Sequence, residues 1–189
     1  MLNRAAASSL TIEVPDPALV VLVGAAGAGK STFAARHFEA AEIISSDALR
    51  AVLTGDEADQ RATRLAFAIL HREVSRRLAT GRTVVVDATN VESHARRTLV
   101  GRAAAAGVPA IAIVLALPAD VVDLRNRTRP GRVVDPEIVD RHLTRLAAAV
   151  DRGAFATEGF AAVHLLRSVS DVEDAVIERR QPMRESIGG

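Results

Sequence analysis

The sequence predicts an α/β fold in which a parallel sheet is covered by helices on both faces. Short apolar runs rich in β-branched residues alternate along the chain with longer segments of helical periodicity, a pattern typical of βαβ units. Glycine or proline ends several of these segments. A glycine-rich stretch, residues 24–29, joins an early apolar run to the helix that follows it. Together these features indicate an open parallel sheet with a loop built for close backbone approach.

The predicted elements follow one another in a regular order. Strands are expected at 10–15, 20–23, 42–47, 83–87, 110–117 and 161–166. Helices are expected at 30–40, from 47 onward, and at 60–79, 92–106, 119–129, 135–151 and 169–178, with an acidic loop over 54–60. The helix over 60–79 is predicted from an apolar stripe at helical spacing, formed by Phe67, Leu70, Val74 and Leu78. We expect one domain over residues 10–181, with tails at 1–9 and 182–189.

Composition excludes several classes of protein. Hydrophobic residues make up 49% of 189 residues, enough for a substantial core, and no apolar run is long enough to span a membrane. The chain has no cysteine, and residues 1–9 lack the apolar core of a signal peptide, so a cytoplasmic location is expected. With a net charge of +1 and no Tyr or Trp, any nucleic-acid binding must depend on local arginine clusters.

Residues 24–31 have the pattern G-x-x-x-x-G-K-S, which is typical of a phosphate-binding loop. Glycines let backbone amides turn inward around a triphosphate, and the following helix points its positive end at the same anion. Lys30 is the only lysine among 24 basic residues, and a compact ammonium suits this position. The alternative is a glycine-rich turn that binds nothing. The residues expected around ATP and Mg²⁺ are Gly24, Ala25, Ala26, Gly27, Ala28, Gly29, Lys30, Ser31 and Thr32.

Two aspartates lie where predicted strands end, and functional groups gather at such ends in open parallel sheets. Asp47 follows the run 43–46 and is a candidate general base for an attacking hydroxyl, or else an N-cap of the next helix. Asp87 closes the run 83–86 and is a candidate Mg²⁺ ligand together with Ser31, or else an ordinary turn residue.

An arginine-rich segment, residues 125–132, is expected to form a lid. Arg125 and Arg129 are four residues apart on a predicted helix and suit the charge of a transferring phosphoryl group, with a solvated basic face as the alternative. Arg127 is expected in solvent, and Arg132 follows the Pro-Gly break. Arg50 could contact an acceptor phosphate or pair with an acidic neighbour. The pairs 76–77 and 96–97 are interpreted as surface arginines, and the five histidines as structural residues.

Four segments together, 22–34, 43–47, 84–91 and 125–132, resemble the kinase module of bacterial polynucleotide kinase-phosphatase, an RNA end-healing enzyme, and more distantly phage polynucleotide kinase. The resemblance covers about residues 10–181 and implies the P-loop NTPase fold. It further implies ATP-dependent phosphorylation of a 5′-hydroxyl end of RNA or DNA. Phosphatase and ligase modules, in a larger protein or as separate chains, are the partners it implies.

The resemblance also implies residue roles. Lys30 and Ser31 would bind the phosphates and Mg²⁺, and Asp47 would serve as general base. Arg50 would contact the nucleic acid near its 5′ end. Arg125 and Arg129 would clamp the transferring phosphates. Arg132 would be a further contact from the lid, and Asp87 a metal-site residue.

Two other functions fit the same motifs. A phosphate loop with an aspartate base suits any hydroxyl acceptor, so a small-molecule kinase acting on a sugar, an antibiotic or a nucleotide is one alternative. The other is a nucleotide-binding switch that transfers nothing. A switch needs no acceptor base, and the presence of Asp47 with Arg125 and Arg129 therefore favours an enzyme.

Overall fold

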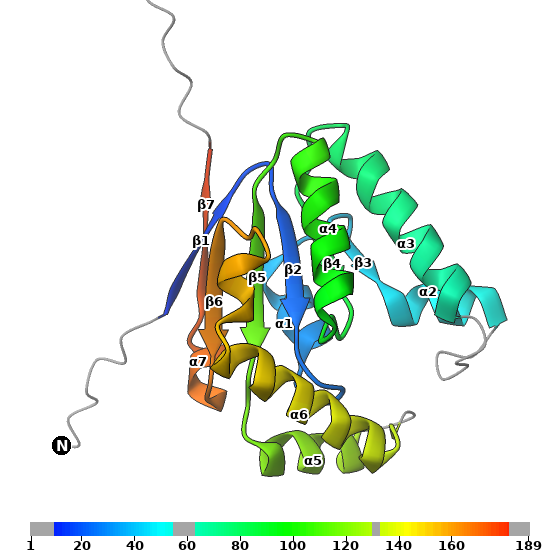
Figure 1. The fold of residues 1–189 in the computed structure, drawn as a ribbon, viewed down its shortest axis with the longest axis vertical. Coiled ribbons are helices and arrows are strands. Elements are labelled where there is room, and N and C mark those ends of the chain that lie inside the picture. Colours follow the sequence, from blue (N-terminus) through cyan, green and yellow to red (C-terminus); the bar gives the residue numbers. More distant parts are fainter. Residues whose placement is uncertain (1–9, 55–62, 130–132, 182–189) are drawn as a thin grey trace, which may run out of the picture.

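The computed structural model describes residues 10–54, 63–129 and 133–181 (Figure 1). Its centre is a five-stranded sheet with the order β3-β4-β2-β5-β6, in which every pairing is parallel. The strands are β2 (Leu19–Val23), β3 (Ile43–Ser45), β4 (Val84–Asp87), β5 (Ala110–Leu115) and β6 (Ala162–Leu166). The predicted α/β fold with a parallel sheet and helices on both faces is confirmed.

Helices surround this sheet. They are α1 (Lys30–His37), α2 (Ser46–Thr54), α3 (Thr63–Leu78), α4 (Ser93–Ala105), α5 (Ala119–Thr128), α6 (Pro136–Asp151), α7 (Val169–Glu173) and the 3₁₀ turn η2 (Ala154–Thr157). Among the described helices, none has the length and apolar character needed to cross a membrane. The acidic loop expected at 54–60 falls mostly outside the described residues.

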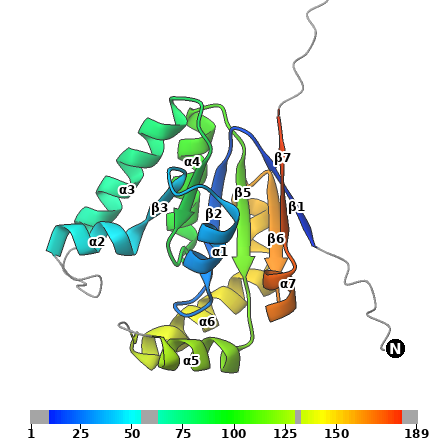
Figure 2. The same cartoon turned by 180° about the vertical axis from the view of Figure 1, so that it is seen from behind.

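Alternate residues of the central strands supply two separate cores. On one face, Val20 and Leu22 of β2 pack with Phe33 of α1. On the other face, Val21 packs with α3 and α4, where Leu70 represents the predicted apolar stripe. Figure 2 shows α1 on the near side of the sheet, and Figure 1 shows α4 on the opposite side. Strands buried on both faces read as continuous apolar runs, which is why β2 is apolar at all five positions.

Helix α6 passes across the carboxyl edge of the sheet. Val139 near its start belongs to the same core as α1, whereas Leu146 and Ala149 belong to the core with α3 and α4. In Figure 1, α5 and α6 lie beneath the tips of the strand arrows. The two helices therefore cover the edge at which the phosphate loop leaves β2.

The prediction of a single helix over 169–178 is wrong in its second half. Helix α7 ends at Glu173, and residues 176–180 form strand β7 (Val176–Arg180), which pairs in parallel with β1 (Thr11–Pro15) as a second, two-stranded sheet. Ile12 and Val14 of β1 are fully buried, so this sheet closes the core beside α1. The paired residues of β1 and β7 are 165 positions apart in sequence, so local periodicity does not predict this strand.

One arginine is misplaced by the sequence interpretation. Arg96 was expected at the surface with Arg97, but its side chain is 1% exposed and ranks first in volume among the fully buried side chains. Arg76 is exposed as expected and pairs with Glu73 on the same helix. Arg77 also pairs with Glu73, and it is partly buried because it also reaches the carbonyl of Ala41.

Candidate active site

The loop after β2 folds as a cradle that only glycine permits at its tightest points. Gly27 and Gly29 have positive φ values of 86° and 95°. A Cβ atom on Gly27 would lie 2.9 Å from the carbonyl oxygen of Val122, and one on Gly24 would lie 3.1 Å from that of Leu115. Helix α1 begins at Lys30 directly after the loop, with no acidic residue in its first turn. Its positive end is therefore left for an external anion.

Lys30 bends back over this loop. Its Nζ donates hydrogen bonds of 3.0 Å to the carbonyl of Gly24 and 2.8 Å to that of Ala25. The residue is 8% exposed, so the ammonium lies within the loop instead of in bulk solvent. The chain's single lysine thus places its charge at the loop that the motif predicts for a polyphosphate.

Ser31 and Asp87 meet at the carboxyl edge of the sheet. The Ser31 hydroxyl donates a 2.7 Å hydrogen bond to Oδ2 of Asp87, which is 6% exposed. Across the described part of the chain, no three His, Cys, Asp or Glu residues form a metal cluster. Mg²⁺ commonly binds through only one or two protein oxygens together with substrate phosphates. A hydroxyl and a carboxylate beside a phosphate cradle therefore fit the predicted Mg²⁺ site.

Asp47 belongs to the first turn of α2 but does not cap it. The helix begins at Ser46, and the Ala48 amide donates instead to the hydroxyl of Ser45, at 3.4 Å. The carboxylate of Asp47 pairs with the guanidinium of Arg50, one turn along the helix. This geometry disfavours the N-cap interpretation of Asp47. For Arg50, the structure shows the pairing with an acidic neighbour, Asp47. Its contact with an acceptor phosphate stays a prediction.

One of the predicted lid arginines, Arg125, contacts the phosphate loop. Arg125 on α5 donates from Nη1 to the carbonyl of Ala28 at 3.3 Å, and the same atom would be 3.3 Å from a Cβ on Gly29. Arg129 lies one residue beyond α5, with extended backbone, so the expected shared helix face ends just before it. Arg127 is exposed, as expected. Arg132 lies outside the described residues, and the arginine-rich lid is not confirmed.

A single cleft of about 740 Å³ brings these side chains together. Its lining includes Lys30, Ser31, Asp47, Asp87, Arg125 and Arg129, together with Arg50. The cleft lies at the topological switch point, since the chain runs from β2 to β3 and β4 on one side of β2 and then crosses to β5 and β6 on the other. Ligands of open α/β sheets bind at this position.

Two residues of the cleft region were not among the predicted site residues: His142, which the sequence analysis interprets as structural, and Asn126. His142 on α6 lines the cleft, and burial together with the charges of Lys30 and Arg141 lowers its pKa. Its spacing from the buried Val139 and Leu146 is the signal that could have identified it.

The other of these residues is Asn126, which is 2% exposed. Its amide nitrogen donates to the carbonyl of Val134 at 2.7 Å, and its Oδ1 accepts from the Val134 amide at 3.1 Å. Its Cβ would be 3.2 Å from a Cβ on Gly27. Asn126 thus joins α5 to the start of the α6 segment beside the phosphate loop, and nothing in the local sequence marks this role.

The fold and cleft define a P-loop α/β protein of the kinase-like class, which binds nucleotides such as ATP, usually with Mg²⁺. A family model described as an AAA domain matches residues 19–152, so the chain belongs to that family. No curated protein matches the chain in sequence.

Solved structures share this fold at low identity. A chain of the Pnkp1/Rnl/Hen1 RNA repair complex has a TM-score of 0.63 and 21% identity, covering 74% of this chain and 47% of its own length. A gluconokinase from Sinorhizobium meliloti 1021 has a TM-score of 0.53 and 19% identity, and the match covers 85% of this chain and 88% of the gluconokinase. A chain of the PezAT toxin–antitoxin system of Streptococcus pneumoniae has a TM-score of 0.59 and 15% identity, and the match covers 79% of this chain and 66% of the PezAT chain. This chain thus spans less than half of the repair-complex chain, and these likenesses show the fold.

Proposed function

We propose that this chain is an ATP-dependent polynucleotide 5′-hydroxyl kinase that acts in nucleic-acid repair. The observation that carries the proposal is the presence of Asp47 in the same cleft as the phosphate loop. A carboxylate at that position is what transfer to a hydroxyl requires, and simple nucleotide binding does not require it. The cleft volume is in the upper part of the range of roughly 300–1,000 Å³ for small-molecule sites, which leaves space beyond the donor phosphates.

Each residue has a role that follows from its position. Lys30 and the loop amides would hold the β- and γ-phosphates, while Arg125 and Arg129 would neutralise charge on the transferring group. Ser31 and Asp87 would hold Mg²⁺, which when bound supplies charge neutralisation at the β/γ oxygens. Asp47 would accept the proton of the attacking hydroxyl, so that the oxygen attacks the γ-phosphorus in line with the leaving ADP.

Arg50 orients Asp47 in this proposal. Its guanidinium side chain is 8% exposed and pairs with a carboxylate that is 31% exposed. The more exposed partner is then the one available to an incoming hydroxyl. A nearby 5′-terminal phosphodiester would be a second partner for the same guanidinium, in keeping with its predicted contact to nucleic acid.

Two features support a polynucleotide acceptor. The four matching segments resemble polynucleotide kinase modules, and the fold resembles a chain of an RNA repair complex. Without Tyr or Trp, such an acceptor would be held mainly by arginine–phosphate contacts and apolar packing, and the phosphate contacts carry little sequence preference and weaken with salt. Phosphatase and ligase modules, which the resemblance implies, are the partners proposed for such an enzyme.

A phosphate-transfer assay tests the proposal. ATP labelled at the γ-phosphate is offered with matched 5′-hydroxyl RNA, 5′-hydroxyl DNA and their 5′-phosphorylated counterparts. Labelling of the 5′-hydroxyl strands alone is expected. Transfer to a small hydroxyl compound but to neither nucleic acid would instead indicate a small-molecule kinase. ATP binding without any transfer would favour a nucleotide-binding switch.

Asp47→Asn tests the base. We expect kcat to fall about 100- to 10,000-fold, the usual contribution of a general base, while affinity for ATP is retained. Asp140→Asn, at an exposed position of α6, is the matched control. Full transfer by the Asp47 variant would remove the mechanism.

A small-molecule kinase is the second candidate. The observation in its favour is length, because this chain covers 88% of the gluconokinase with which it shares a fold, against 47% of the repair-complex chain. A panel of sugars, sugar acids and nucleosides in the same assay separates the two candidates. Salt dependence is a further criterion, since only a polyanionic acceptor predicts strong loss of binding at high salt.

A further inference from the structure

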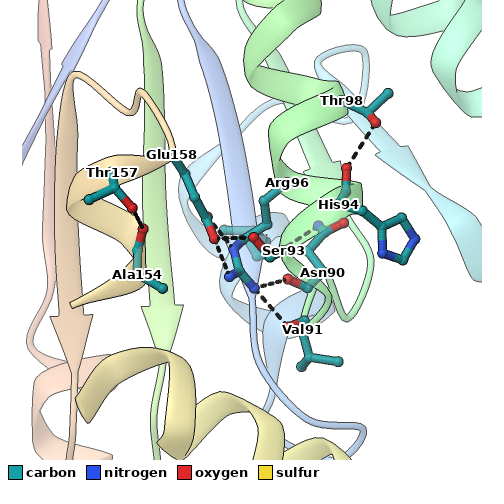
Figure 3. Close-up of polar contacts among 10 residues, drawn as sticks. Asn90, Val91, Ser93, His94, Arg96, Thr98, Ala154, Thr157 and Glu158 are labelled. Carbon is teal, nitrogen blue, oxygen red and sulfur yellow. Dashed lines mark hydrogen bonds and ion pairs between the residues drawn. The ribbon is translucent and has the colours of Figure 1, made fainter. Parts of the chain in front are cut away.

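Arg96 and Glu158 form a buried ion pair between α4 and the segment after η2 (Figure 3). Nε and Nη2 of Arg96 each donate a 2.6 Å hydrogen bond, to Oε2 and Oε1 of Glu158 respectively. The two side chains are 1% and 0% exposed. Because both charges are desolvated, such a pair is weak evidence for stability, and apolar residues of similar size often serve a core equally well.

The remaining edge of the guanidinium points to the loop that follows β4. Nη1 of Arg96 donates to the carbonyl of Asn90 at 3.0 Å and to that of Val91 at 2.8 Å. The guanidinium also lies over the ring of Phe155, 4.4 Å from the ring centre. Ser93 donates to Glu158 at 2.8 Å and holds the carboxylate in place. Figure 3 shows the Arg96 guanidinium between the Glu158 carboxylate and the carbonyls of Asn90 and Val91.

Those carbonyls belong to a turn that contacts the phosphate-loop strand. Asn90 has a positive φ of 49°, a conformation that disfavours most side chains. Its side-chain amide donates to the carbonyl of Leu22 at 2.8 Å, and the Gly24 amide donates to the carbonyl of Thr89 at 3.0 Å. The turn therefore joins the end of β4, which carries Asp87, to the start of the phosphate loop.

We propose that Arg96 and Glu158 are positioning residues that hold the turn 89–91, and through it set the phosphate loop against Asp87. The proposal rests on the proposed function for its catalytic meaning, since the Ser31–Asp87 site would be the feature that is pre-organised. Arg96 touches neither nucleotide nor acceptor. It acts by supplying donors to two carbonyls of this turn.

The first test removes both charges together, so that neither is left buried alone. In Arg96→Met/Glu158→Met the core stays filled, but the carbonyls of Asn90 and Val91 lose their donors. We expect the variant to fold and the Gly24 amide to exchange its hydrogen about tenfold faster in NMR measurements, the equivalent of one lost hydrogen bond. Unchanged exchange at Gly24 in the folded variant would overturn the proposal.

The second readout is the Mg²⁺ dependence of binding of a non-hydrolysable ATP analogue, measured by calorimetry. We expect the gain in affinity on adding Mg²⁺ to shrink about 10- to 100-fold, the usual effect of disturbing the support of a metal site. Binding without Mg²⁺ should change less. A purely structural pair would lower thermal stability and leave this difference intact, which would contradict the proposal.

Arg97→Met is the matched control, since Arg97 is the next residue of α4 and is exposed. Arg96→Lys is the second variant, because lysine keeps a cation near Glu158, but one ammonium cannot face the carboxylate and the two carbonyls from separate edges as the guanidinium does. If the double variant does not fold, faster exchange at Gly24 in Arg96→Lys supports the proposal, and native exchange there refutes it. Amide exchange is measured without substrate, so its result stands even if the chain does not phosphorylate polynucleotides.

Discussion

The Ser31 hydroxyl donates a 2.7 Å hydrogen bond to the Asp87 carboxylate, which joins the first turn of α1 to the end of β4. Two residues 56 positions apart in sequence thus present their oxygens at one point of the cleft. Backbone register explains the meeting, since Asp87 lies opposite Leu22 of β2 and Ser45 of β3. These are the two oxygens that we propose would hold Mg²⁺.

Asp87→Asn should weaken binding of the Mg²⁺ complex of a non-hydrolysable ATP analogue by about 10- to 100-fold. The neutral amide can still hydrogen-bond to Ser31 but binds Mg²⁺ poorly, so binding without Mg²⁺ should change little. Titration calorimetry with and without Mg²⁺ measures both quantities. Asp151→Asn, at the exposed end of α6, is the control. Equal losses with and without Mg²⁺ would exclude Asp87 as a metal-site residue.

Gly27→Ala should abolish nucleotide binding, because the new Cβ would lie 2.9 Å from the Val122 carbonyl and force the loop away from α5. Gly81→Ala is a matched comparison, since Gly81 also has a positive φ, of 69°, but no atom within 4 Å of its Cβ position. That variant should lose only about 1–2 kcal/mol of stability, the cost of the left-handed backbone. Urea unfolding and nucleotide titration of the two variants separate backbone strain from collision. Similar behaviour of both would contradict the role given to close approach.

Arg125→Ala should lower kcat about 1,000-fold or more, as expected for an arginine that stabilises a transferring phosphoryl group. Its Nη1 already lies at the phosphate loop, 3.3 Å from the Ala28 carbonyl. Arg127→Ala provides the comparison, since Arg127 is on the same helix but exposed. Single-turnover transfer rates measure the effect. A rate loss shared by the two variants would indicate a general electrostatic effect and not a specific contact.

Stability should decrease as the pH falls below about 6.5. Burial lowers the pKa of His71 from its ordinary value of 6.5, and the charge of Arg102 lowers it further. Burial also lowers the pKa values of three other histidines, His37, His142 and His164. The unfolded chain then takes up protons that the folded chain resists, so stability is full above pH 6.5 and is lost on acidification. Urea midpoints at pH 7.5 and 5.5 measure the difference.

His71→Gln should reduce that difference, with His94→Gln, at an exposed position of α4, as the control. An unchanged pH dependence in His71→Gln would show that burial of this ring does not contribute to acid sensitivity.

Much of the fold was predictable because its signals are local. The apolar run of β2, the glycines of the phosphate loop and the stripe of α3 each report their own structure over a few residues. Strand β7 was missed for the opposite reason. Its residues form a strand through pairing with β1, and the segment alone resembles the continuation of a helix.

The site shows the same division. Lys30, Ser31, Asp47 and Asp87 could be selected by residue type and position at strand ends, and the structure lines one cleft with them. Their catalytic and metal-binding roles stay predictions. Arg96 could not be selected, because an arginine on a helix is usually solvated. Its burial is tolerable because Glu158, from a distant segment, and two backbone carbonyls bind its guanidinium.

The sequence by itself determined the alternation of strands and helices, the phosphate-loop motif and the kind of chemistry that such a motif serves, since each depends on spacing within a short stretch. Tertiary structure decided which distant groups meet: the Ser31–Asp87 pair, the Asn126 bridge, and the buried arginine that supports the turn after β4. The physical reason is desolvation, because a polar group is buried only where the rest of the chain brings it a partner.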